Sequence, residues 1–151
     1  MRIARIGSAG HEKPAVVTAN EYILVDSLID DWSRVSLEAA AMAKVTAADL
    51  TGLPRVAKGS TRIGSPINRP TKVICVGLNY LGHIKETNAD TPAEPVIFMK
   101  APDSVVGPND DIVIPPNSTA TDYEVELAIV IGKRALYLIS AADSKAHILG
   151  Y

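Results

Sequence analysis

The sequence predicts an α+β protein that is mostly β: a small α/β domain over residues 1–68, followed by a mixed β-sheet over residues 69–151. Short apolar runs rich in β-branched residues recur along the chain and are typical of strands. One alanine-rich stretch near residue 40 has helical spacing. Six prolines between residues 92 and 116 interrupt the second half too often for a doubly wound βαβ array.

The first domain is expected to hold three strands and one helix. The strands are predicted over Arg2–Ile6, Ala15–Thr18 and Tyr22–Val25, and the helix over Leu37–Val45. Residues 49–54 predict a short helical turn that Gly52 and Pro54 end. Residues 58–70 are polar and rich in Gly, Pro and Ser, a composition typical of a linker.

The second domain is expected to be built from strands. They are predicted over Lys72–Val76, Val96–Lys100, Ile112–Ile114 and Asp122–Ile131. Between the first two, residues 78–87 predict a loop that runs into one helical turn. A last helical turn is predicted over Ser140–Ala146.

Charge and hydropathy exclude several classes of protein. Fifteen basic and seventeen acidic residues give a net charge of −2, which does not suit a protein that binds nucleic acid through bulk positive charge. The sequence has no apolar run near the ~20 residues of a membrane helix and no signal-peptide pattern. Its one cysteine, Cys75, cannot form an internal disulfide. We therefore expect a cytoplasmic protein with no nucleic-acid or membrane partner.

The predicted strand Asp122–Ile131 carries the clearest candidate site. Alternate side chains of a strand share a face, so Asp122, Glu124 and Glu126 are expected on one face, opposite an apolar one. Neighbouring carboxylates of this kind are ligands that Mg²⁺ or Mn²⁺ prefers. The alternative is an exposed strand face that happens to be acidic.

A second candidate site is the segment from Asn79 to Glu86. His83 and Glu86 are three residues apart, so on a helical turn the carboxylate can orient the imidazole, and such a pair can deprotonate water. The alternative is an ordinary solvated pair on a helix surface. Lys100 ends a predicted strand, where it either binds an anionic substrate or extends into solvent.

From Arg62 to Tyr151 the sequence resembles the fumarylacetoacetate hydrolase family. The residues that carry the resemblance are Arg62–Pro66, Lys72–Tyr80 with His83 and Glu86, Glu94–Pro102, Val106–Pro108, Ile114–Pro116 and Asp122–Gly132. Their order and spacing make a chance match unlikely.

The resemblance implies a mixed β-roll and a metal-dependent hydrolase that cleaves a C–C bond in a β-diketo acid, an acylpyruvate or a 2,4-diketo-3-deoxy sugar acid. By similarity, Glu124 and Glu126 are ligands of Mg²⁺ or Mn²⁺, which polarises the diketone and stabilises the departing enolate. His83 and Glu86 activate the attacking water. Lys100, Asn79 and Tyr80 are expected to bind the oxo-acid substrate.

The family takes its third metal ligand from an Asn-Asp-x-Ser-x-Arg segment that follows the Gly-Tyr pair at residues 150–151. We therefore expect an incomplete β-roll, the third ligand beyond Tyr151, and a chain that is inactive alone. Two alternatives share the same residues: an oxo-acid isomerase or decarboxylase of this family, and an inactive piece that acts only as a binding module. Members of the family are usually dimers, so a homodimer is expected.

Overall fold

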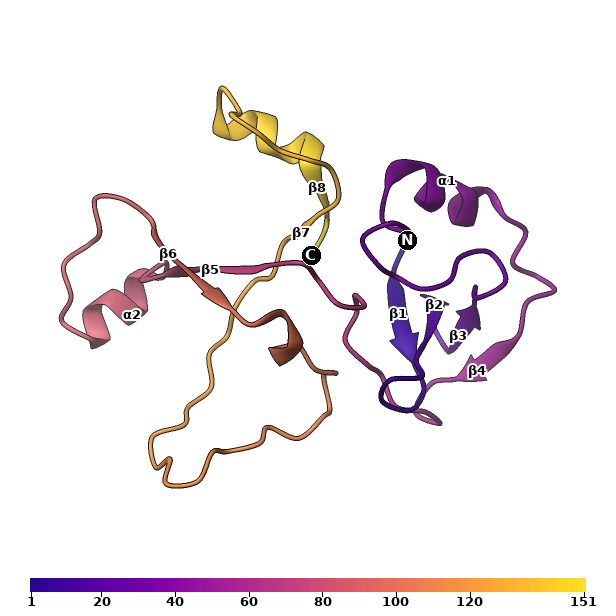
Figure 1. Ribbon diagram of the computed structural model, residues 1–151, viewed down its shortest axis with the longest axis horizontal. Helices are drawn as coiled ribbons and strands as arrows, with labels where there is room; N and C mark the ends of the chain where they lie inside the picture. Colours follow the sequence, from indigo (N-terminus) through magenta and orange to yellow (C-terminus); the bar gives the residue numbers. More distant parts are fainter. The chain divides into compact units, whose positions relative to one another are not determined.

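The computed structural model describes residues 1–151, which divide into two compact units. We call Met1–Asn68 with Val106–Tyr151 the sheet unit, and Arg69–Val105 the hairpin unit. Eight short strands and only two α-helices make up most of the regular structure (Figure 1). The prediction of a mostly β chain is confirmed.

Four antiparallel strands begin the sheet unit: β1 (Ile3–Ile6), β2 (Lys13–Val17), β3 (Glu21–Leu24) and β4 (Arg55–Ala57), hydrogen-bonded in that order. Val16 lies opposite both Ile3 and Ile23, so β2 is paired along both edges. The first three strands were predicted from their alternation. β4 was not predicted, because three residues are too few to show a period of two.

A small core lies between this sheet and α1 (Ala39–Ala47). Val25, Trp32 and Val45 are almost completely buried there, and the Trp32 indole N–H donates a hydrogen bond to the Ala15 carbonyl at 3.2 Å. The predicted helix is confirmed, but it begins two residues later than expected. The Ser36 hydroxyl accepts the Ser33 N–H at 2.8 Å in the preceding turn, so it does not cap the helix.

The helical turn predicted over residues 49–54 is wrong. The Asp49 carboxylate accepts both the backbone N–H and the hydroxyl of Thr51, at 3.0 and 2.6 Å, and the segment forms a non-helical turn. Asp competes with helical hydrogen bonding in this way because its short side chain reaches the backbone two residues on.

The hairpin unit contains β5 (Val73–Gly77) and β6 (Val96–Lys100), which pair antiparallel with Cys75 opposite Phe98. Between them lies α2 (Leu81–Glu86), and the short 3-10 helix η1 (Pro102–Ser104) follows. The two strands and the helical turn were predicted. Ile84 is the one buried residue of this unit.

The last part of the sheet unit differs most from expectation. Residues 112–114 form no strand, and only β7 (Val130–Ile131) remains of the strand predicted over residues 122–131. β7 pairs with β8 (Ile148–Gly150). The 3-10 helix η2 (Ala141–His147) immediately precedes β8 and lies where a helical turn was predicted. An alternating pattern forms a strand only when another strand accepts its hydrogen bonds, and residues 122–129 have no such neighbour. Tyr123 and Val125 are consequently 82% exposed.

The longest helix, α1, has nine residues, and none of the helices is long and apolar enough to cross a membrane.

Candidate functional site

His83 and Glu86 lie together on α2 of the hairpin unit, three residues apart, and both are exposed. Tyr80 is the N-cap residue of this helix, and Asn79 is in the turn before it, where Leu78 has a φ of +50°. Asn79, Tyr80 and His83 therefore lie in one short segment at the start of the helix.

The backbone carbonyl of His83 takes part in the hydrogen bonds at the C-terminal end of α2. The His83 carbonyl accepts both the backbone N–H and the hydroxyl of Thr87, at 3.1 and 2.9 Å. These bonds satisfy a carbonyl that a short helix leaves unpaired at its C-terminus. The imidazole itself stays exposed and available to a solute.

Lys100 is the last residue of β6 in the same unit, opposite Val73. Its ammonium nitrogen lies 5.9 Å from the centre of the Phe98 ring, within range of a weak cation–π contact. The ammonium makes no ion pair, so its charge can interact with an anion.

Glu124 and Glu126 belong to the sheet unit, where both are exposed and neither makes an ion pair. Their carboxylates are oxygen donors of the type that Mg²⁺ and Mn²⁺ bind, so the donor chemistry fits a divalent cation. They supply two of the roughly six ligands such an ion takes. No three His, Cys, Asp or Glu side chains gather closely enough to share a metal ion.

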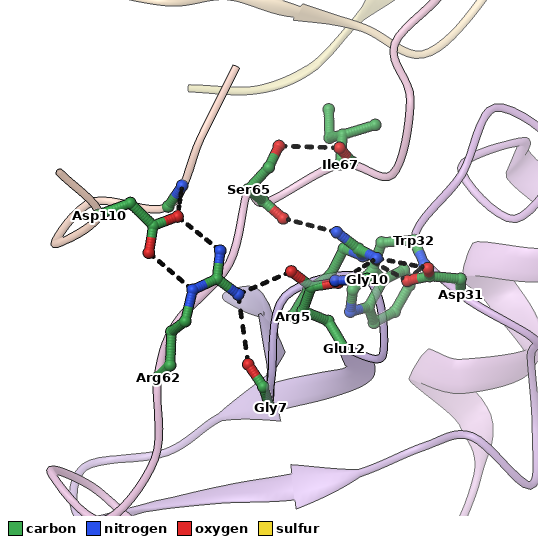
Figure 2. A network of polar contacts seen from close by, with 11 residues as sticks. Arg5, Gly7, Gly10, Glu12, Asp31, Trp32, Arg62, Ser65, Ile67 and Asp110 are labelled. Carbon is green, nitrogen blue, oxygen red and sulfur yellow. Dashed lines mark hydrogen bonds and ion pairs between the residues drawn. The ribbon is translucent and has the colours of Figure 1, made fainter. Parts of the chain in front are cut away.

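The structure also contains a chain of five alternating charges that was not predicted from the sequence. It runs from Asp31 through Arg5, Glu12 and Arg62 to Asp110, all within the sheet unit (Figure 2). Each charged side chain in this series contacts only side chains of the opposite charge. Such pairing offsets the cost of burying a charge.

Arg5 and Glu12 are the most buried members, with side chains 8% and 7% exposed. The Nε and Nη2 of Arg5 donate to the two carboxylate oxygens of Asp31 at 2.7 and 2.9 Å, and Nη2 also reaches Glu12 at 3.3 Å. Its Nη1 donates to the Ser65 carbonyl at 3.3 Å. The guanidinium is thus surrounded by acceptors, and every buried side-chain nitrogen and oxygen of the chain has a hydrogen-bond partner.

Arg62 joins the network to Asp110. Its Nε donates to one carboxylate oxygen of Asp110 at 2.6 Å and its Nη2 to the other, while Nη1 donates to Glu12 at 2.7 Å and to the Gly7 carbonyl at 3.2 Å (Figure 2). Two parallel N–H···O bonds to one carboxylate give the strongest and most directional form of ion pair.

These contacts shift the pKa values of both carboxyls. Burial by itself raises the pKa of Glu12, but the hydrogen bond from Arg62 and the charges of Arg5 and Arg62 outweigh it, so the pKa of Glu12 lies below its ordinary value. The hydrogen bond from Arg62, followed by that from the Gly107 N–H, lowers the pKa of Asp110. Both groups therefore remain ionised in moderately acidic solution.

One signal in the sequence points to this network. Arg5 stands inside the strand Ile3–Ile6, between the buried residues Ala4 and Ile6. A charged side chain there requires a partner, because an isolated buried charge is very costly. The sequence does not say which of its seventeen acids supplies it.

The sheet unit contains a cavity of about 260 Å³. Its polar lining includes His11, Lys13 and Thr61, and the Lys13 ammonium is already paired with Asp26 at 2.7 Å. No predicted catalytic or metal-binding residue lines it.

Comparison with known proteins gives a consistent result. Residues 72–151 match the family model described as "Fumarylacetoacetate (FAA) hydrolase C-terminal". The chain is 46% identical over 112 residues to "Oxaloacetate tautomerase FAHD2A, mitochondrial" of Bos taurus, a match that covers 74% of the chain and 35% of that protein. It is 40% identical over 153 residues to "2,4-didehydro-3-deoxy-L-rhamnonate hydrolase" of Sphingomonas sp. (strain SKA58), covering 100% of the chain and 51% of the relative.

A solved structure agrees with these sequence matches. The fumarylacetoacetate hydrolase from psychrophilic Exiguobacterium antarcticum superposes with a TM-score of 0.73 at 34% identity, covering 98% of the chain and 52% of that structure. The chain thus spans between a third and a half of the length of these relatives.

Proposed function

Because the chain belongs to the fumarylacetoacetate hydrolase family, we propose that the protein carrying it hydrolyses a C–C bond in a β-diketo acid with the help of a divalent metal ion. One observation carries the proposal. The family match over residues 72–151 includes every residue for which the sequence suggests a chemical role: Asn79, Tyr80, His83, Glu86, Lys100, Glu124 and Glu126.

The substrate class is the one that the family resemblance implies, and the chemistry of these side chains is compatible with it. Lys100 offers a positive charge for the carboxylate of an oxo acid, such as an acylpyruvate or a 2,4-diketo-3-deoxy sugar acid. The sugar-acid alternative is supported by the printed name of the Sphingomonas relative, a 2,4-didehydro-3-deoxy-L-rhamnonate hydrolase. Asn79 and Tyr80 add an amide and a phenol for hydrogen bonds to the substrate's other oxygen atoms.

His83 and Glu86 are proposed to activate water. The neutral imidazole of His83 accepts a proton from water as the oxygen attacks a substrate carbonyl carbon, and the Glu86 carboxylate stabilises the imidazolium that results. The C–C bond then breaks, the electron pair passes to the departing carbon, and His83 returns a proton to that carbon. A divalent cation at Glu124 and Glu126 would supply Lewis-acid polarisation of the substrate's carbonyl oxygens when bound.

An oxo-acid tautomerase is the second candidate. The bovine relative is named an oxaloacetate tautomerase, and it is 46% identical over 112 residues, whereas the Sphingomonas hydrolase is 40% identical over 153 residues. Tautomerisation moves one proton between carbon and oxygen and consumes no water, so His83 serves it as a proton carrier. The two reactions share their residues and differ in their products.

Proton NMR of the reaction mixture distinguishes them. When the protein that carries the chain is incubated with Mg²⁺ and acetopyruvate, hydrolysis yields pyruvate and acetate in equal amounts, whereas a tautomerase changes only the keto–enol ratio of oxaloacetate. Cleavage is expected to stop with a chelator and in Glu124→Gln, and to persist in Glu38→Gln, an exposed glutamate at the start of α1. Cleavage that survives both the chelator and Glu124→Gln would refute the metal-dependent mechanism. Enol conversion without cleavage would favour the tautomerase.

A further inference from the structure

Two segments of the chain connect the hairpin unit to the sheet unit: residues 62–68 before it, which we call the first passage, and residues 106–110 after it, the second passage. Arg62 begins the first passage, and Asp110 ends the second. Both residues belong to the sheet unit, and their side chains hold each other there.

Backbone hydrogen bonds attach the first passage to the rest of the sheet unit up to Asn68, its last residue. The Gly64 N–H donates to the Arg5 carbonyl at 2.8 Å, and the Asn68 N–H donates to the Trp32 carbonyl at 2.7 Å. Ile63 forms an antiparallel bridge with Ile6 at the end of β1. Residues 62–68 therefore do not behave as a free linker, although their composition suggests one.

The second passage is held directly against the first. Gly107 is buried, and a Cβ atom placed on it would overlap the Ile63 carbonyl oxygen and lie 3.1 Å from the Gly64 Cα. The Gly107 N–H donates to Asp110 at 2.7 Å, and the Asp110 N–H returns a bond to the Gly107 carbonyl at 3.1 Å. This turn presents the Asp110 carboxylate to Arg62.

The hairpin unit buries little of its own surface. Ile84 is its one buried residue, and every residue of β6 is exposed. A two-stranded hairpin with so little burial is marginally stable in water, and its orientation depends on the two passages that connect it. Two passages fixed at one point allow less rotation than two that move independently.

We propose that Arg62 and Asp110 are positioning residues, which hold the two passages together and so restrict the orientation of the hairpin unit. That unit carries His83, Glu86 and Lys100. The consequence for catalysis rests on the proposed function, whereas the restriction of orientation does not.

The chain contains a natural pair of reporters for this proposal. Trp32, its one tryptophan, is fully buried in the sheet unit, and Cys75, its one cysteine, is partly exposed on β5 of the hairpin unit. A thiol-reactive acceptor dye on Cys75 and time-resolved energy transfer from Trp32 report the distribution of distances between the units. In Asp110→Asn the width of this distribution is expected to increase about twofold.

Three variants of the same chain serve as comparisons. Asp110→Glu keeps the charge and is expected to retain a narrow distribution, while Arg62→Lys keeps the charge without the paired bonds and should give an intermediate width. Arg55→Gln removes the exposed pair between Arg55 and Glu21 at 3.0 Å in the same sheet, and should leave the distribution unchanged. An increase in Asp110→Asn that Asp110→Glu reverses supports the proposal.

The proposal is overturned if Asp110→Asn leaves the width unchanged, or if Arg55→Gln broadens it equally. If Asp110→Asn fails to fold, as shown by loss of the Trp32 emission of the folded chain, Arg62→Lys is compared with the unchanged chain instead. An unchanged width in Arg62→Lys then overturns the proposal. Where the protein is active, kcat should fall in Asp110→Asn with KM little changed. Absence of activity in the protein that carries this chain would reject only the proposed function, because the distance distribution is measured without substrate.

Discussion

Arg62 and Asp110, 48 positions apart in the sequence, form a two-point contact in which Nε and Nη2 of the arginine each donate to one oxygen of the carboxylate. The same guanidinium donates through Nη1 to Glu12 and to the Gly7 carbonyl. One side chain thus joins the segment after the hairpin unit to the loop between β1 and β2.

Acid is expected to weaken the sheet unit through Glu12 and Asp110. Their pKa values in the folded chain lie below the ordinary values of 4.5 and 3.8. Their stabilisation is therefore fully present above pH 4.5 and is lost as the pH falls through the lowered pKa values. The urea midpoint of Trp32 emission, measured between pH 7 and pH 2, should fall across that range. A double variant, Glu12→Gln with Asp110→Asn, should show a flatter profile; an equally steep one would contradict the assignment.

Replacing Arg5 by methionine should destabilise the chain strongly. The substitution leaves the carboxylate of Asp31, which is 15% exposed, without its partner, and breaking a buried pair on one side costs about 3–5 kcal/mol. Urea unfolding followed by Trp32 emission measures the change. The matched control is Arg55→Met, whose exposed pair with Glu21 should contribute less than about 1 kcal/mol. Similar losses in the two variants would show that burial of Arg5 is unimportant.

A methyl group at Gly107 is expected to separate the two passages. It would overlap the Ile63 carbonyl oxygen, and overpacking of this kind costs about 1–3 kcal/mol. Gly107→Ala should therefore speed amide exchange at Gly64, whose N–H is bonded to the Arg5 carbonyl. Gly82→Ala on α2 is the control, because nothing lies within 4 Å of a Cβ there. Unchanged exchange at Gly64 would contradict the close packing at Gly107.

Loss of the imidazole of His83 should slow the proposed hydrolysis. A general base contributes about 10²–10⁴-fold to rate, so kcat for acetopyruvate should fall by that factor in His83→Gln with a smaller change in KM. His11→Gln, in the loop of the sheet unit that lines its cavity, should keep full activity. A fully active His83→Gln would assign water activation to another group.

The strands that were predicted correctly are those whose partner is near in the sequence. β1, β2 and β3 follow one another through short turns, and β5 pairs with β6, so each alternating pattern meets a partner strand. Residues 122–129 carry an equally clear alternation, yet no strand of this chain pairs with them. Alternation describes which side chains share a face; it does not provide the second strand that hydrogen bonding requires.

In the candidate site, too, only the local arrangement of residues could be predicted from the sequence. The spacing of His83 and Glu86 is local, and α2 brings both onto one helix as that spacing suggests. The roles of His83, Glu86, Lys100, Asn79 and Tyr80, and of Glu124 and Glu126 as metal ligands, stay predictions. The grouping of residues 69–151 as one catalytic domain and the expected homodimer also stay predictions.

The sequence by itself determined the family, the mostly β composition and the short elements whose patterns are complete within a few residues. It carried the family's motifs because those depend on residue identity and order. Only the tertiary structure decided that Arg62 pairs with Asp110 and that Arg5 is surrounded by Asp31 and Glu12. Fifteen basic and seventeen acidic side chains permit many pairings. The Arg62–Asp110 pair forms where the backbone at Gly107 packs closely against Ile63 and Gly64, and no spacing along the chain encodes that packing.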